Sequence, residues 1–364
     1  MLRETVRQLH RELIETGLEG LHRISIALVD EAYLRTYVDS TEGIQPLKHH
    51  SIPLEKSPSL SALVRQKKTR IVDDYSSYLR QCRGKASAWL RESQLHSSYT
   101  IPIFFQNNFL GFIFFNSCNK AFFNPLTVAT LDDTVKSLRE SIIHERTLFD
   151  NIVSLSKFSE KASEIRDECT AMHCGRLTTL TRIIARHVVQ HCPVTDREVY
   201  YLIKFSPLHD IGKIGVADDI LLKPGRLTAE EFREMKRHVE YGMTMVDAAC
   251  DGVVKQHEAY RIIRTLISEH HEMLDGSGYP EGLKGEEISL FSRIVTVSDI
   301  FDALTSDRPY KKAWTLEQAL TELQAMADHG KLDPLCVEAL QQYFDQPDAQ
   351  QRFTLFREEA RMCA

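Results

Sequence analysis

Hydrophobic residues in the first third of the chain recur in short runs that are typical of strands. RISIALVD (residues 23–30) and YLRTYVDS (33–40) are separated by a two-residue turn, and TRIVDDY (69–75) is a further short run. PSLSALVRQKK (58–68) instead has the spacing of a helix, with proline in the first helical position. The pattern therefore predicts strands and helices in alternation.

A β-hairpin is expected near the end of this part. SSYTIPIFF (97–105) and NFLGFIFFNS (108–117) are rich in aromatic and β-branched residues and flank Gln106-Asn107. Together with the earlier runs, the hairpin predicts an α+β domain, an antiparallel sheet flanked by helices, over residues 1–124.

The periodicity changes at Leu126. Hydrophobic residues now fall mostly at steps of three and four, with Glu145 as an interruption, which predicts a long amphipathic helix over residues 125–162. The residues of this stripe are Val128, Leu131, Val135, Leu138, Ile142, Phe149 and Ile152. The helix could pack on its own domain, or it could pair with a second copy as a parallel dimer seam. We favour the seam and expect a homodimer.

The remainder of the chain, residues 163–364, is almost wholly helical in pattern, which predicts an all-α helical bundle. Its expected helices are separated by loops at 212–219, 223–226 and 275–285.

Length and composition are those of a globular protein with two domains. The 364 residues are 43% hydrophobic and contain no apolar run long enough to cross a membrane. The first seventeen residues are mixed in charge and helical in pattern, unlike a signal peptide. Eight scattered cysteines without CxxC spacing indicate reduced thiols. These features predict a cytoplasmic protein that is not attached to a membrane.

Charge is distributed unevenly. Residues 1–150 contain 19 Lys and Arg against 17 Asp and Glu, whereas residues 151–364 contain 26 against 34, so the halves carry +2 and −8. An acidic C-terminal half is a poor surface for long nucleic acid, which we do not expect as a partner. It is suited to binding metal cations.

Histidines are concentrated in this acidic half. Eight of the fifteen lie between His173 and His271. In LHDIGKIG (208–215), His209 and Asp210 are adjacent and Lys213 follows one turn later. Adjacent side chains on a helix point about 100° apart and can reach different ions. Imidazole with carboxylate suits Mn, Fe or Zn better than Ca.

A second histidine-rich segment is HHEMLDGSGYPEGLKG (270–285), where two adjacent histidines precede a glycine-rich loop. Gly276, Gly278 and Gly282 are expected to permit unusual backbone dihedrals, and Tyr279-Pro280 to stiffen the tip of the loop.

Two resemblances to known families follow from these motifs. Ser-x-Tyr-Thr-x-Pro-Ile followed by Leu-Gly-Phe-Ile-Phe-Phe, within residues 10–124, resembles GAF domains, which implies a sensor of an unknown small ligand. HDIGK, HHEMLDGSGYPEGLKG and DIFDALTSDRPYKKAW, within residues 166–345, resemble the HD-GYP branch of the HD-domain metal phosphohydrolases. The chain would then be a GAF-like domain joined by a long helix to an HD-domain helical bundle.

The HD-GYP resemblance implies a set of metal ligands. Asp210 would bridge two divalent ions, Fe or Mn, and Lys213 would lie beside them. The implied ligands are His173, His209, Asp210, His238, His270, His271 and Asp299. Some family members have a glutamate, associated with a third metal, where this chain has Cys169, so we expect two ions.

The resemblance also implies a substrate. Cyclic di-GMP would be opened to linear pGpG, and further to GMP in some members, by metal-activated water with Asp210 and Lys213 as catalytic residues. Gly278 and Tyr279 would lie beside the substrate, and Arg308 and Lys311 would bind its phosphate. Asp302 and Asp307 are interpreted instead as residues that hold helix ends or loop hydrogen bonds, with substrate contact as the alternative.

Other functions remain open from the sequence. The substrate could be 3′,3′-cyclic GMP-AMP or a mononucleotide, although the GYP loop argues against the latter. The domain could also be a cyclic-dinucleotide receptor or a protein-docking module, although a complete ligand set argues against a pure receptor.

Overall fold

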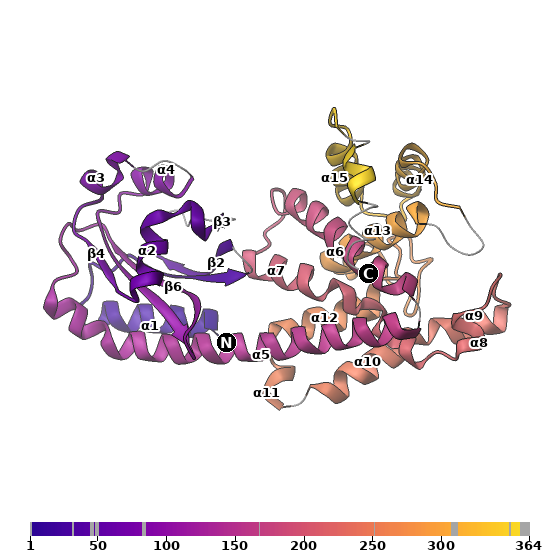
Figure 1. Ribbon diagram of the computed structural model, residues 1–364, viewed down its shortest axis with the longest axis horizontal. Helices are drawn as coiled ribbons and strands as arrows, with labels where there is room; N and C mark the ends of the chain where they lie inside the picture. Colours follow the sequence, from indigo (N-terminus) through magenta and orange to yellow (C-terminus); the bar gives the residue numbers. More distant parts are fainter. Residues whose placement is uncertain are drawn as a thin grey trace. The chain divides into compact units, whose positions relative to one another are not determined.

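The computed structural model describes most of the chain, and its backbone divides into two compact units (Figure 1). Unit 1 comprises Met1–Leu148 and Thr195–Arg197, and unit 2 comprises Phe149–Val194 and Glu198–Ala364. The residues described are 2–30, 33–43, 47, 51–81, 85–166, 168–250, 252–306, 312–348 and 351–356.

Unit 1 is built on a six-stranded sheet of order β3-β2-β1-β6-β5-β4 in which every neighbouring pair is antiparallel. The predicted sheet is therefore confirmed, with one additional short edge strand. The strands are β1 (Arg23–Asp30), β2 (Tyr33–Thr41), β3 (Ser51–Pro53), β4 (Arg70–Val72), β5 (Ser97–Phe105) and β6 (Asn108–Ser117).

The predicted hairpin joins β5 to β6 through Gln106 and Asn107. Both residues have left-handed φ angles, 47° and 69°, as a two-residue type I′ turn requires. Gly111 of β6 lies against the backbone of β1. A Cβ atom at Gly111 would stand 2.1 Å from the carbonyl oxygen of Ala27.

Helices cover both faces of this sheet (Figure 1). Helices α1 and α5 share a core with Ile26, Ile113 and the other apolar residues on one face, and α2 packs on the opposite face against Phe112. The helices of this part are α1 (Leu2–Glu15), η1 (Leu54–Lys56), α2 (Pro58–Gln66), α3 (Tyr75–Tyr78), η2 (Leu79–Gln81), α4 (Lys85–Glu92) and α5 (Pro125–Arg166).

The expected dimer seam on α5 is wrong for its first half. Leu131, Leu138 and Ile142 are fully buried in the core of unit 1, so they are not available to a second copy. The apolar stripe is near-heptad, but the sheet of the same chain presents an apolar face that buries it first. Unit 1 consequently extends to Leu148 and does not end at residue 124.

Later residues of the stripe belong to unit 2. Phe149 is buried there and stacks on Tyr200 with ring centroids 4.8 Å apart. Glu145, which interrupts the stripe, is buried within unit 1 and accepts a hydrogen bond from the Tyr37 hydroxyl at 3.1 Å.

Unit 2 is helical. Among its described residues it has no strand, only an isolated bridge between Asp275 and Lys284, so the predicted all-α architecture is confirmed. Its helices are α6 (Glu168–Val188), α7 (Asp196–Phe205), η3 (Ser206–Gly215), α8 (Asp218–Leu221), α9 (Ala229–Lys236), α10 (His238–Ala249), α11 (Gly252–Lys255), α12 (Glu258–Glu269), η4 (Gly285–Glu287), α13 (Leu290–Thr305), α14 (Leu316–Asp328) and α15 (Pro334–Phe344). Within the described ranges, every helix is too short or too polar to cross a lipid bilayer.

Candidate metal centre

The seven residues expected to bind metal converge inside unit 2 from five segments of its chain. They form two groups, and the ligand atoms within each group lie within 4.8 Å of one another. One group contains Asp210, His238, His270 and His271, and the other contains His173, His209 and Asp299. The sequence therefore identified a set of residues that the fold brings together.

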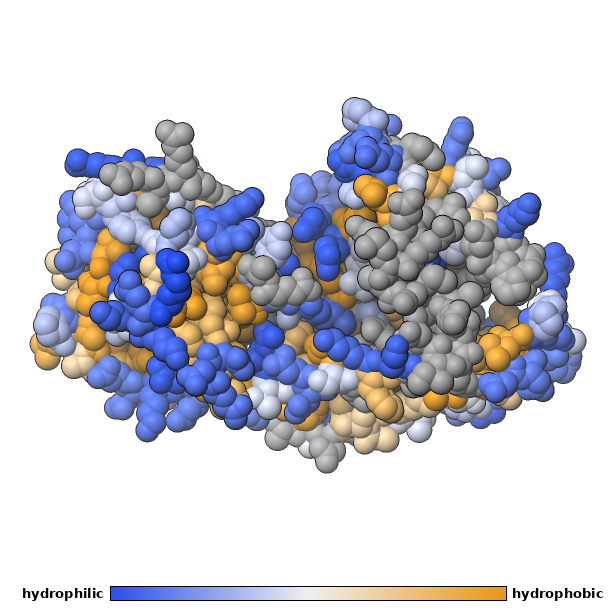
Figure 2. Space-filling view, viewed as in Figure 1, coloured by the Kyte–Doolittle hydropathy of each residue, from blue (hydrophilic) through white to orange (hydrophobic). Residues whose placement is uncertain are grey.

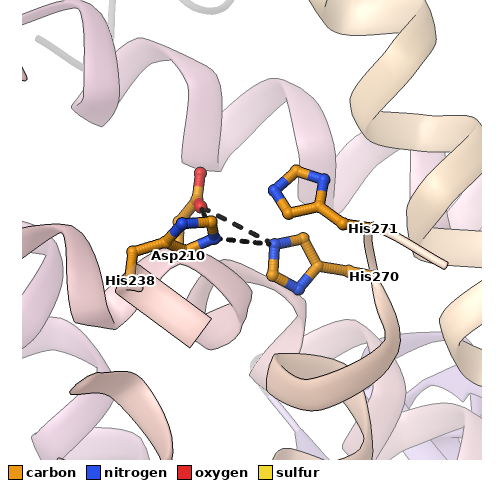
Figure 3. Close-up of side chains that lie close together, drawn as sticks. All are labelled: Asp210, His238, His270 and His271. Atoms are coloured by element: carbon orange, nitrogen blue, oxygen red, sulfur yellow. Dashed lines mark hydrogen bonds and ion pairs between the residues drawn. The ribbon is translucent and has the colours of Figure 1, made fainter. Parts of the chain in front are cut away.

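Asp210 contacts both groups, and Figure 3 shows it beside His238, His270 and His271 of its own group. Its Oδ1 atom is 3.4 Å from Nε2 of His238 and 3.8 Å from Nε2 of His270. Its Oδ2 atom is 3.1 Å from Nε2 of His209 and 2.5 Å from Nζ of Lys213. One carboxylate thus presents an oxygen to each group, which is the arrangement that a bridging ligand needs.

The backbone fixes which nitrogen of each buried imidazole carries the proton. Nδ1 of His209 lies 2.8 Å from the carbonyl oxygen of Ser206, and Nδ1 of His238 lies 2.8 Å from that of Met235. Nδ1 of His270 lies 3.0 Å from the carbonyl oxygen of Ile267. A carbonyl only accepts, so Nδ1–H donates and the lone pair of each neutral ring is on Nε2.

These Nε2 lone pairs face one another. Nε2 of His238 is 3.3 Å from Nε2 of His270, and Nε2 of His173 is 3.4 Å from Nε2 of His209. Two lone pairs at this distance repel unless a cation lies between them. Oδ1 of Asp210, directed at the same place, is buried and has no hydrogen-bond partner among the described residues. An unsatisfied buried carboxylate oxygen is costly, and a divalent cation removes that cost.

Burial also keeps most of these rings neutral. Desolvation lowers the pKa of His238, lowers that of His270 well below its usual value, and lowers that of His271 to about 3. Burial works in the same direction at His209, but the neighbouring Asp210 raises its pKa overall. Neutral imidazole is the form that binds metal, because protonation would occupy the lone pair.

The local fold around the HD pair depends on Gly212. His209 and Asp210 lie on η3, which is a 3₁₀ helix. A Cβ atom at Gly212 would stand 1.7 Å from the carbonyl oxygen of His238. Only glycine lets η3 approach the first residue of α10 so closely.

Asp302 holds His173 in position. Its Oδ2 atom accepts a hydrogen bond from Nδ1 of His173 at 2.8 Å, and Arg176 binds the same carboxylate through Nε and Nη2. Although burial opposes ionisation, these hydrogen bonds keep the pKa of Asp302 below its usual value. Asp302 therefore supports a candidate ligand, a role that was not expected from the sequence. Its position three residues after Asp299, on the same face of a helix, was the available signal.

The glycine-rich loop is organised by Glu272, which sequence reasoning missed. This buried carboxylate accepts hydrogen bonds from the backbone N–H groups of Glu281 at 2.7 Å, Gly282 at 3.1 Å and Leu283 at 3.0 Å. It directly follows His271, so the loop is attached beside a candidate ligand. An acidic residue beside paired histidines was visible in the sequence, but its partners were not.

The glycines of the loop have different roles. Gly276 and Gly282 have left-handed φ angles of 82° and 69°, which confirms the expectation for these two. Gly278 does not, and its importance is space, because a Cβ there would stand 2.5 Å from the carbonyl oxygen of His271. Tyr279, which follows, stacks on the His271 ring with centroids 4.6 Å apart.

The expectations for Asp307, Arg308, Lys311 and Cys169 concern parts of the chain that the structure does not describe; Asp307 lies outside the described residues. Arg308 and Lys311 lie outside the described residues, as does the side chain of Cys169.

Comparison with known proteins gives this helical part a family. Residues 164–335 match the family described as HD domain. This part of the chain is an HD domain. The match contains all seven residues of the candidate metal centre.

Curated relatives align over about half of this chain. A cyclic di-GMP phosphodiesterase response regulator from Xanthomonas campestris is 41% identical over 50% of this chain and 45% of its own length. A cyclic di-GMP phosphodiesterase from Thermotoga maritima is 42% identical over 49% of this chain and 45% of its length. A 3′3′-cGAMP-specific phosphodiesterase from Vibrio cholerae is 36% identical over 50% and 36%. The chain thus spans less than half the length of these relatives.

Solved structures that align with the N-terminal part include the GAF domain/HD domain protein from Geobacter sulfurreducens. It is 16% identical, with a TM-score of 0.34, over 40% of this chain and 94% of that chain.

Proposed function

We propose that the HD domain is a metal-dependent phosphodiesterase of the HD-GYP type that hydrolyses a cyclic dinucleotide. The observation that carries this proposal is the convergence of Nε2 lone pairs in each of the two ligand groups. In the group of His238 and His270 they are joined by Oδ1 of Asp210, which has no hydrogen-bond partner among the described residues. Seven ligands exceed the needs of one ion and suit two six-coordinate ions, with positions left for water and substrate. Imidazole with carboxylate favours Fe or Mn.

When bound, two such ions supply Lewis-acid activation of a water and of the phosphoryl oxygens. The chain's own residues position them. Asp210 would hold both ions through its two oxygens, and Asp302 fixes the ring of His173. Lys213, with Nζ beside Asp210 and a third of its side chain exposed, offsets negative charge that develops on the phosphate. No side-chain nucleophile is required.

Cyclic di-GMP is the proposed substrate, and linear pGpG, with GMP beyond it, the proposed product. Relatives named for cyclic di-GMP and for 3′3′-cGAMP both align with the same half of the chain, so 3′,3′-cyclic GMP-AMP is the second candidate. Tyr279 beside His271 supports a substrate that can stack on an aromatic ring. Arg308 and Lys311 remain proposed phosphate-binding residues.

Regulation by the N-terminal unit is part of the proposal. A sensor domain of the GAF type would respond to a small ligand, and homodimerisation through surfaces other than the buried part of α5 is compatible with its packing. We place the protein in the cytoplasm. A receptor or docking module with little turnover is the alternative, and turnover decides between them.

The proposal is tested by metal analysis of anaerobically purified protein together with turnover assays. We expect close to two Fe or Mn per chain and hydrolysis of cyclic di-GMP, with 3′,3′-cyclic GMP-AMP as the comparison. Protein that holds both ions and hydrolyses neither dinucleotide would be a receptor. Protein that takes up no metal under these conditions would contradict the site itself.

A further inference from the structure

An aromatic stack leads from the metal centre to the surface of unit 2. Tyr279 lies on His271 with ring centroids 4.6 Å apart, and Phe232 of α9 meets Tyr279 edge-on at 6.4 Å. Phe232 is 46% exposed, and Leu222 nearby in the sequence is 48% exposed. Figure 2 shows hydrophobic surface among hydrophilic surface at the end of unit 2 that carries α8 and α9.

A lysine lies against both outer rings of this stack. Nζ of Lys236 is 4.6 Å from the ring centroid of Tyr279 and 4.9 Å from that of Phe232. Both distances are within the range of a cation–π contact. The charge is thus positioned one aromatic ring away from a candidate metal ligand.

Lys236 differs from three basic neighbours that form ion pairs. Lys223 pairs with Glu231 at 2.6 Å, Arg233 with Glu230 at 2.8 Å, and Arg237 with Glu234 at 3.1 Å. Within the described part of the chain, Lys236 has no carboxylate partner. Residues 151–364 carry a net charge of −8. In this acidic half, a cation that lies over aromatic rings beside a metal centre and lacks a carboxylate partner is suited to an anionic ligand.

We infer that Phe232, Lys236 and Tyr279 form the site for the second nucleotide of the substrate. A nucleobase stacks on the exposed ring surface of Phe232, and Lys236 pairs with the phosphate that is not at the metals. Stacking tolerates any base, so this face gives affinity for a dinucleotide without choosing guanine over adenine. The inference rests on the proposed cyclic dinucleotide substrate.

The first test compares matched variants on two substrates. Phe232→Ala is paired with Leu222→Ala, which removes an equally exposed apolar side chain, and Lys236→Met with Arg233→Met, which removes a charge from the same helix. We expect the KM for cyclic di-GMP to rise about 10-fold in Phe232→Ala and Lys236→Met, with kcat little changed. Both controls should keep the wild-type KM.

Hydrolysis of bis-p-nitrophenyl phosphate, which has no second nucleotide, should be unchanged in all four variants. An unchanged KM for cyclic di-GMP in Phe232→Ala would overturn the inference and assign the face to another partner, such as a protein. Equal losses on both substrates would also overturn it. The capping box of α9, between Thr228 and Glu231, is retained in every variant, and circular dichroism with metal content verifies folding.

A second measurement separates this inference from the proposed activity. Binding of linear pGpG and of inorganic phosphate to the Mn-loaded chain is measured by calorimetry, which needs no turnover. We expect Phe232→Ala to weaken pGpG about 10-fold and leave phosphate unchanged. If the wild type binds pGpG in this way but hydrolyses no cyclic dinucleotide, the proposed activity fails and the nucleotide site stands. If the wild type does not bind pGpG, or the variant binds it equally well, the nucleotide site fails.

Discussion

His238 and His270 face each other through Nε2 atoms 3.3 Å apart, while Nδ1 of each ring is directed at a backbone carbonyl. The backbone therefore selects the tautomer in which the two lone pairs oppose each other. An apoprotein with this geometry holds two repelling acceptors beside Oδ1 of Asp210, which has no hydrogen-bond partner in the described part of the chain. The arrangement becomes favourable only when a cation lies among these three acceptor atoms. Metal binding and folding of the domain should therefore be coupled.

Asp210→Asn should uncouple metal binding from folding of the domain. The amide cannot offer a charged oxygen to both groups, so we expect the variant to lose most of its metal and its turnover. Added Mn should raise the free energy of unfolding of the wild type by about 2.7 kcal/mol per site at one hundred times the dissociation constant, and the melting temperature should rise with it. The same addition should leave Asp210→Asn nearly unchanged. Elemental analysis and calorimetry measure both effects.

Lys213→Met is the contrasting variant on the same carboxylate. It removes a charge that lies 2.5 Å from Asp210 but no metal ligand, so both ions should stay while kcat falls about 100-fold. Wild-type turnover by Lys213→Met would show that the lysine has no part in the reaction.

Asp302→Asn should weaken one metal site selectively. The carboxylate orients His173 and carries the charge opposite Arg176, and loss of such a support typically costs 10- to 100-fold in metal affinity. His173 belongs to only one of the two groups. Titration with Mn should therefore show one weakened and one normal site, whereas two equally weakened sites would indicate general damage to the fold.

Glu272→Gln should loosen the glycine-rich loop. The amide replaces one of the acceptors that receive the N–H groups of residues 281–283, at a cost of roughly 1–3 kcal/mol. Hydrogen exchange of the amides of 281–283 should accelerate, and the metal should remain bound. Glu286→Gln, an exposed change nearby on η4, is the control. Equal protection in both variants would contradict the role of Glu272.

The sequence indicated the ligands through its resemblance to the HD-GYP family, whose motifs fix the residue types and their order. It could not indicate their supports, because Glu272 binds backbone N–H groups and any sequence offers those. The stripe on α5 was misassigned for a related reason. Periodicity shows that one face of Leu131, Leu138 and Ile142 is apolar, but not whether the covering surface comes from the same chain. Gly278 resembled Gly276 in the sequence, yet only the fold shows that its role is close packing.

The last prediction concerns the pH dependence of unit 1. His10 is buried on α1, with Nδ1 2.9 Å from Oγ of Ser40 and Nε2 3.1 Å from the carbonyl oxygen of Leu21. Burial lowers the pKa of His10 below its usual value of 6.5. Below pH 6.5 the unfolded chain consequently binds more protons than the folded one, so the free energy of unfolding falls as the pH decreases through 6.5 towards the folded-state pKa.

Denaturant unfolding in a Trp314→Phe background isolates this unit, because the remaining tryptophan, Trp89, lies within it. Lowering the pH should reduce the free energy of unfolding of the parent protein. The loss is about 1.4 kcal/mol for each unit by which the pKa of His10 differs between the folded and unfolded states. His10→Gln should remove much of this dependence, because glutamine does not titrate. His144→Gln, an exposed change in the same unit, should retain it. A pH dependence that is identical in all three proteins would show that another group of unit 1 is responsible.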